Sequence, residues 1–126
     1  MTQTLAAPTG RQPAQELFDM LTRRRDEAAD AWTRQDMLVQ ASRAAIDLGP
    51  GDEADRATTY AQLHEQTALA DTLRMHLDEL ESAIRRAEAG SYGFCDGCGD
   101  TIAAGRLELF PAATHCVTCK QRRSPR

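Results

Sequence analysis

Two long stretches of this chain repeat apolar residues at alternating steps of three and four, the spacing that lines side chains along one face of a helix. The first repeat is mostly apolar with three polar interruptions, and it runs through Phe18, Leu21, Arg25, Ala28, Trp32, Gln35, Val39, Ser42 and Ile46. Leu17 and Leu38 widen its apolar face. About thirty residues at ~1.5 Å each make a rod of roughly 45 Å, which needs a partner to cover its apolar face.

The second stretch supplies that partner. Its repeat has no slip and runs through Leu63, Gln66, Ala70, Leu73, Leu77, Leu80, Ile84 and Ala87. Pro50, between two glycines, predicts a break before a second helix that starts at Asp52, because proline cannot donate a helical hydrogen bond. Helices joined by so few residues run antiparallel. We therefore expect a coiled-coil hairpin over residues 14–90, with its tip near 48–57 and Gly90 just after its end.

The composition agrees with a mainly α protein. The chain has 126 residues, only 5% of them aromatic, which suits a small module plus one extended element better than a large core. The formal net charge of −4 argues against a broad surface for duplex nucleic acid, and only residues 120–126 are locally basic. Residues 1–13 lack a cationic start followed by an apolar run, so we expect a flexible leader and a soluble, cytoplasmic protein.

All four cysteines fall in two Cys-x-x-Cys pairs, Cys95 with Cys98 and Cys116 with Cys119. Two such pairs fifteen to twenty residues apart give one Zn²⁺ four thiolates in a tetrahedron. Gly97 and Gly99 flank Cys98, where a tight turn favours positive φ and the backbone must approach the sulfurs. Two disulfides or a redox pair are the alternatives, and a redox pair needs a βαβ pattern that this chain lacks.

The zinc-ribbon module is expected over residues 91–120, followed by a basic tail at 121–126. The segment between the cysteine pairs is too short for a core of its own, so metal binding must supply folding free energy of order 10 kcal/mol. Its apolar residues, Ile102, Leu107, Leu109 and Phe110, are expected to pack the module onto the base of the hairpin. His115 is next to Cys116, but four well-spaced cysteines leave it as a surface imidazole.

The predicted tip is acidic, with Asp52, Glu53 and Asp55 within four residues. These residues suit the start of a helix, where Asp52 can cap and the other carboxylates face the positive end of the helix dipole. Carboxylates at the end of a long hairpin can also reach a metal or a basic surface in another protein. The histidines are scattered and no nucleophile has a recognisable setting, so we expect no enzyme.

These motifs together resemble one known family. The tip reads Asp-x-x-Asp-x-Ala, and the cysteine region reads Tyr-Gly-x-Cys-x-x-Cys-Gly, Arg-Leu-x-x-x-Pro and Cys-x-x-Cys. The matching positions are Asp52, Asp55, Ala57, Tyr92, Gly93, Cys95, Cys98, Gly99, Arg106, Leu107, Pro111, Cys116 and Cys119. Over residues 16–120 the chain resembles the DksA/TraR family of bacterial transcription regulators. Either half of the pattern alone is a weak signal, whereas the combination is specific.

The resemblance implies a mechanism. DksA-like proteins bind RNA polymerase and insert the coiled coil into its secondary channel, where tip residues alter the stability of promoter complexes. It implies contacts to polymerase from Asp52, Asp55 and Ala57, with no specific DNA binding. A DNA-binding zinc ribbon and a redox- or zinc-responsive regulator are the alternative functions. We expect a monomer, because an antiparallel hairpin covers its own apolar faces.

One departure from the family concerns the alarmone ppGpp. Members that respond to it use basic side chains on the second helix, where this chain has Thr72, Met75 and Glu79. Of the basic positions only Lys120 matches, so we expect weak or absent ppGpp binding. After Cys119 the chain has seven more residues, where the family continues into a helix that touches the polymerase rim.

Overall fold

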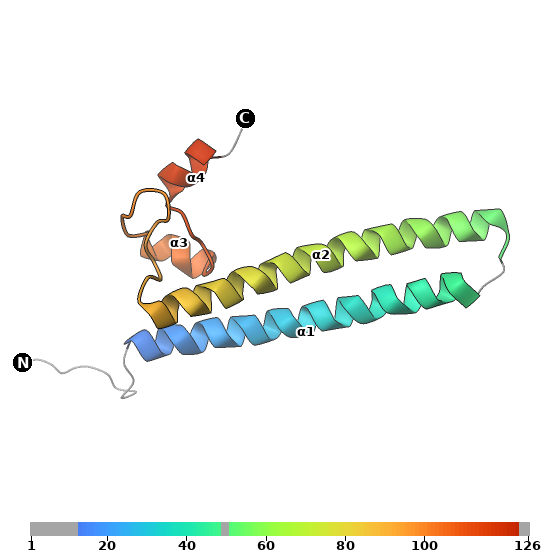
Figure 1. Ribbon diagram of the computed structural model, residues 1–126, viewed down its shortest axis with the longest axis horizontal. Helices are drawn as coiled ribbons and strands as arrows, with labels where there is room; N and C mark the ends of the chain where they lie inside the picture. Colours follow the sequence, from blue (N-terminus) through green and yellow to red (C-terminus); the bar gives the residue numbers. More distant parts are fainter. Residues whose placement is uncertain (1–12, 49–50, 124–126) are drawn as a thin grey trace, which may run out of the picture. The chain divides into compact units, whose positions relative to one another are not determined.

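The computed structural model describes residues 13–48 and 51–123. Four helices follow one another along the chain: α1 Pro13–Leu48, α2 Glu53–Ala89, α3 Ala104–Leu109 and α4 Val117–Arg123 (Figure 1). The described residues contain one isolated β-bridge, Phe94 with Thr101, and no strand. The predicted mainly helical fold with a long hairpin is confirmed. The expected leader up to residue 12, part of the predicted turn at 49–50 and the last three residues lie outside the described residues.

The chain divides into two compact units, which are described separately. One unit combines Met1–Arg24 with Glu79–Arg126, and the other is Arg25–Asp78. Each unit contains a part of both long helices. Among the described residues, no helix has both the length and the apolar character needed to cross a bilayer.

In the unit Arg25–Asp78 the two long helices run antiparallel. Trp32 lies against Arg74, whose guanidinium carbon is 5.2 Å from the ring centre, while Ser42, further along α1, bonds to Gln66, earlier in α2. The residues of both predicted repeats are buried or half-buried throughout this unit. Leu38, expected to widen the apolar face, is instead 53% exposed. It flanks the repeat, and the facing helix covers only the central positions.

The polar residues that interrupt the repeats pair with one another across the helices. Gln35 donates from Nε2 to the carbonyl oxygen of Gln66 over 3.1 Å, and Ser42 donates from Oγ to Gln66 Oε1 over 2.6 Å. A half-buried polar group without a partner costs free energy, and these bonds remove that cost. They also specify register, because a shift of one turn separates the partners.

The other unit contains the most completely buried side chains of the hairpin. Leu21, Leu80 and Ala83 are at most 1% exposed. Leu17, Phe18, Met20, Ala87, Tyr92 and Ala112 pack around the cluster that includes Leu21 and Ala83. Tyr92 and Ala112 belong to the zinc module, so this core joins the module to the base of the hairpin.

Replacing Leu80 by alanine should lower the free energy of unfolding by roughly 2–5 kcal/mol, because it leaves a cavity in a fully packed site. Leu80 is 1% exposed, whereas Leu69 on the same helix is 48% exposed and provides the matched control. Urea unfolding followed by helical circular dichroism measures both variants. Equal losses of stability in Leu80→Ala and Leu69→Ala would contradict this packing.

The second helix ends as the sequence predicts. Gly90 has φ +82°, the left-handed conformation that glycine adopts without strain. The amide of Ser91 donates to the carbonyl of Arg86 over 2.9 Å, and the amide of Gly90 donates to that of Ala87 over 3.3 Å. This pair of bonds is the Schellman arrangement, which satisfies the last carbonyls of a helix. The chain then turns directly into the cysteine region.

The zinc module contacts the hairpin through other residues than expected. Tyr92 packs against the buried cluster at the base of the hairpin, while its hydroxyl donates to the carbonyl of Pro111 within the module over 2.7 Å. Arg86 Nη2, from α2, donates to the carbonyl of Ala112 over 3.4 Å. Burial of the ring raises the pKa of Tyr92, so the hydroxyl remains a donor. The prediction for Leu109 and Phe110 is wrong, since they are 75% and 59% exposed.

Candidate metal centre

The first cysteine pair lies on a tight loop between Phe94 and Thr101. The amide of Cys95 donates to the carbonyl of Asp100 over 2.7 Å, and the amide of Gly99 donates to the carbonyl of Cys95 over 2.9 Å. Gly99 has φ +81°, which supports the expectation of a left-handed glycine at this turn. The loop thus brings Cys95 and Cys98 to the same side of the chain.

Gly97 is needed for a different reason, namely close approach to a sulfur. Its φ is not positive, but a Cβ built on it would lie 3.0 Å from Cys119 Sγ, 3.2 Å from Cys119 Cβ and 3.3 Å from His115 Cδ2. These distances are tighter than most contacts that real Cβ atoms make, so a side chain here requires Cys119 or His115 to shift by a few tenths of an ångström. The expected close approach of the backbone to the sulfurs therefore occurs at Gly97.

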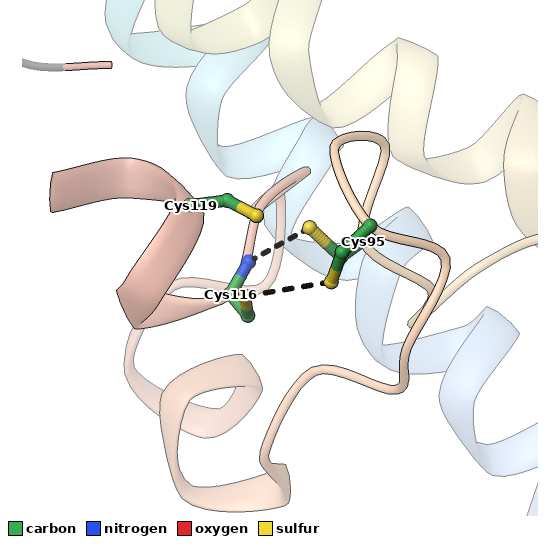
Figure 2. Close-up of side chains that lie close together, drawn as sticks. Cys95, Cys116 and Cys119 are labelled. Atoms are coloured by element: carbon green, nitrogen blue, oxygen red, sulfur yellow. Dashed lines mark hydrogen bonds between the residues drawn. The ribbon is translucent and has the colours of Figure 1, made fainter. Parts of the chain in front are cut away.

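The second cysteine pair is positioned by α4. Cys116 precedes the helix and Cys119 lies in its first turn, where the amide of Lys120 donates to the carbonyl of Cys116 over 2.9 Å. Residues three apart at the start of a helix share one side, so both sulfurs face the first pair. Figure 2 shows Cys116 and Cys119 facing Cys95 across the site.

The four sulfurs have the spacing that a zinc ion requires. All of them lie within 4.8 Å of one another, and Cys98 Sγ is 3.9 Å from Cys116 Sγ. A zinc ion about 2.3 Å from each corner of a tetrahedron separates the sulfurs by about 3.8 Å. His115 is not among the metal-ligating side chains that converge in the described residues. Four thiolates, and no imidazole, thus fit one Zn²⁺.

Hydrogen bonds make the four sulfurs unequal. The backbone amides of Cys116 (Figure 2) and Gly97, each 3.3 Å from Cys95 Sγ, lower the pKa of Cys95 to about 6. Contact with the Cys95 thiolate, which favours a protonated neighbour, raises the pKa of Cys119 to about 12. Zinc takes thiolates as ligands, so its binding displaces the protons that the bare cluster retains. Among the four sulfurs, Cys95 is the one whose thiolate form the two backbone amides favour.

A small apolar cluster lies beneath the sulfurs. Ile102 is buried together with Cys95 and Cys119, and Leu107 packs against them. The two predicted apolar residues that do not reach the hairpin, Leu109 and Phe110, lie at and just after the end of α3. Ile102 and Leu107 thus pack against the cysteines inside the module, whereas they were expected to pack it onto the hairpin.

Three polar residues around the metal centre were not predicted from the sequence as parts of it. Arg106 donates from Nε to the carbonyl of His115 over 2.9 Å, and Thr114 Oγ1 lies 2.8 Å from His115 Nδ1. His115 is half-buried, so the expectation of a plain surface imidazole needs correction. The motif Arg-Leu-x-x-x-Pro singled out Arg106, but its carbonyl acceptor is visible only in three dimensions.

At the tip, Asp52 caps α2 from the position just before the helix. Its Oδ1 accepts the amide of Asp55 over 2.8 Å, and its carbonyl accepts the amide of Arg56 over 3.1 Å. The structure thus brings Asp52 and Asp55 together, and Glu53, Asp55 and Ala57 are exposed in the first turns. His64 and His76 are exposed on α2, away from any group of converging metal ligands in the described residues.

Comparison with known proteins agrees with this geometry. The model of the prokaryotic dksA/traR C4-type zinc finger matches residues 90–125. The solved structure of transcription factor DksA2 from Pseudomonas aeruginosa aligns with 96% of this chain and 90% of its own, at 30% identity and a TM-score of 0.76. The chain belongs to the DksA/TraR family. Within this family the four converging cysteines form a C4 zinc-finger site for one Zn²⁺.

Several curated relatives carry the name RNA polymerase-binding transcription factor DksA. The protein from Haemophilus influenzae is 30% identical over 96 residues, which cover 72% of this chain and 66% of that protein. The protein from Caulobacter vibrioides is 36% identical over 75 residues, which cover 60% of this chain and 53% of that protein. The chain therefore spans between about half and two thirds of the length of these relatives.

Proposed function

We propose that this protein binds bacterial RNA polymerase and regulates transcription by inserting the tip of its helical hairpin into the secondary channel. The observation that carries the proposal is the combination of a C4 zinc finger of this family with a capped, acidic start of α2. Relatives named for polymerase binding support it. A zinc finger that bound DNA alone would leave the acidic tip unexplained, and the formal net charge of −4 opposes it.

The three tip residues have different roles in this proposal. The Asp52 carboxylate accepts the hydrogen bond that caps α2, so Asp52 fixes the shape of the tip. The backbone amide of Asp55 donates the hydrogen bond to Asp52. The Asp55 carboxylate is exposed and makes no hydrogen bond or ion pair with a described residue, so it is available to a cation or a hydrogen-bond donor of the polymerase. Ala57 is exposed and small, which allows close approach of the two surfaces.

A photoreactive amino acid at the exposed position 53, in the first turn of α2 with Asp55, tests this placement without adding bulk at Ala57. Within the polymerase complex it should cross-link to the large subunits near the active site, because the tip lies in the channel. The same group at the exposed position 109 of the zinc module is the control. Cross-linking from position 53 only to the outer surface of polymerase, or to DNA, would contradict the proposal.

We expect ppGpp to bind the complex of this protein with RNA polymerase no more tightly than it binds RNA polymerase alone. Family members that respond to ppGpp have basic side chains at three positions of α2 that are not basic in this chain. Thr72 has a hydroxyl that already donates to the Ala68 carbonyl, Met75 has a 63% exposed thioether, and Glu79 has a carboxylate. None of these attracts a polyphosphate, which needs cationic donors. Radiolabelled ppGpp binding to both species measures the difference. Tight binding by the complex that Lys120→Ala abolishes would refute this expectation.

A redox- or zinc-responsive function is the second candidate, favoured by the exposure of one ligand. Cys98 is exposed and its Sγ lies 3.9 Å from Cys116 Sγ. A peroxide can oxidise Cys98 to a sulfenic acid and is itself reduced to water or an alcohol. The Cys116 thiolate then attacks the Cys98 sulfur, and a disulfide forms as the S–O bond breaks and the oxygen leaves as hydroxide, which takes up a proton to become water. Zinc then loses two ligands. Zinc release that tracks disulfide formation under peroxide would support this second function.

A further inference from the structure

A zinc ion with four thiolate ligands carries a net charge of about −2, which its surroundings must compensate. Groups just outside the ligands do this by hydrogen bonds and positive charge, and their removal typically weakens metal binding by roughly 10- to 100-fold. Positive groups that contact the centre from outside are therefore candidates for controlling how long zinc is retained.

In this protein the compensation from the backbone is uneven. The amides of Gly97 and Cys116 both donate to Cys95 Sγ, each over 3.3 Å. Among residues 13–48 and 51–123, no backbone amide donates to the sulfur of Cys119. Cys119 is buried, so water does not replace the missing donors. This side of the centre needs positive charge from elsewhere.

The side chains of His115 and Arg123 lie on that side. Cys119 Sγ and His115 Cδ2 lie 3.0 Å and 3.3 Å from the place that a Cβ on Gly97 would take, so the Cys119 sulfur and the imidazole border the same space. Arg123 Nη1 lies 3.2 Å from both ring nitrogens of His115. If Nδ1–H donates to Thr114 Oγ1, Nε2 is left to accept from the guanidinium. Arg123 follows Cys119 by four residues on α4, which puts both on one face of the helix.

The backbone that carries the imidazole is held from two other elements. The amide of Asp96, in the loop of the first cysteine pair, donates to the carbonyl of Thr114 over 2.8 Å. Arg106, in α3, donates from Nε to the carbonyl of His115 over 2.9 Å. The residues just before Cys116 are thus fixed to the first loop, to α3 and to α4. No described carboxylate pairs with either arginine.

We propose that Arg106, His115 and Arg123 form an outer clasp that retains zinc: Arg106 positions the His115 backbone, and Arg123 supplies positive charge to the Cys119 side through the imidazole. The clasp is independent of polymerase binding, because it concerns only the metal centre. Arg123 acts through His115 and contacts no sulfur directly. Its charge is permanent, so the clasp is present at any physiological pH.

Zinc release from the full chain tests the clasp. Arg123→Gln and Arg122→Gln remove the same charge from neighbouring positions of α4, but only Arg123 contacts His115. With a chromogenic chelator in excess, Arg123→Gln should lose zinc roughly tenfold faster than the wild type. Arg122→Gln should stay close to the wild-type rate. High salt should narrow the gap between wild type and Arg123→Gln, because it screens exposed charge.

Arg123→Lys separates charge from simple packing. Lysine keeps the positive charge, so this variant should release zinc more slowly than Arg123→Gln, and helical circular dichroism before chelation checks that both variants are folded. Equal release rates in Arg123→Gln and Arg122→Gln would overturn the proposal. So would equal rates in the Lys and Gln variants, or a gap that salt does not change.

Discussion

Replacing Cys95 by serine is expected to unfold the zinc module while the long hairpin stays helical. Cys95 accepts two backbone amides and is buried with Ile102 and Cys119, so the other ligands cannot substitute for it. Structural zinc supplies folding free energy of order 10 kcal/mol, and the module has little other core. Zinc content per chain should fall from one to near zero, and circular dichroism should lose only the contribution of α3 and α4.

A matched control for this variant is available one residue along the chain. Asp96→Asn changes an exposed side chain in the same loop and keeps the hydrogen bond from the backbone amide of residue 96 to the carbonyl of Thr114. It should bind one zinc ion and keep the wild-type spectrum. If Cys95→Ser also retained stoichiometric zinc and an unchanged spectrum, the four-cysteine site would be wrong.

Replacing Asp55 by asparagine should abolish most of the effect on transcription while the chain still binds polymerase. The substitution keeps the shape of the side chain and the backbone amide that donates to Asp52, but it removes the exposed negative charge. A charge-assisted hydrogen bond contributes about 1.5–3 kcal/mol, and its loss at the tip corresponds to a roughly 10- to 100-fold smaller effect on the equilibrium of the promoter complex. The loss of one carboxylate near a helix start costs the helix only about 0.3–1 kcal/mol. In vitro transcription from a responsive promoter measures the effect.

Glu53→Gln is the control for the tip, because it removes another exposed carboxylate from the same helical turn. The family resemblance assigns no contact to that position, so this variant should regulate nearly as well as the wild type. Equal activity of Asp55→Asn and the wild type would remove the tip from the mechanism. Equal losses in both variants would mean that only the total charge of the tip matters.

The hairpin could be predicted because its signal is periodic over many turns. Steps of three and four placed Ala28, Val39, Ala70 and Leu77 in the buried face, and the structure buries all four. Which polar residues pair was not predictable. The bonds of Gln35 and Ser42 to Gln66 depend on the register between two helices, which neither repeat specifies alone.

The zinc module was predictable only in its ligands. Cysteine spacing alone identified the four sulfurs, because tetrahedral geometry restricts the lengths of the loops. The helices α3 and α4 have six and seven residues, too few for a periodic signal. Leu109 and Phe110 are exposed because Tyr92 and Ala112 occupy the contact with the hairpin. A short sequence with several apolar residues does not reveal which of them turns inward.

The outer contacts of the metal centre were the least predictable. His115 adjoins a ligand and was expected to be a surface residue, yet its carbonyl and its ring both have arginine partners. Those partners lie nine and eight residues away, on two different helices. Only the folded module brings them together. A hint was present in the basic C-terminal segment, although its charge alone suggested no specific contact.

The most direct test of polymerase binding through the secondary channel is a competition experiment with purified bacterial RNA polymerase. A fluorescent factor known to occupy the channel is bound first, and the zinc-loaded chain is titrated in. The proposed function predicts displacement by the wild type, and also by Asp55→Asn, which keeps the hairpin but loses regulation. No displacement by a chain that retains its zinc, even at saturating concentration, would contradict it and leave the zinc-responsive function as the better explanation.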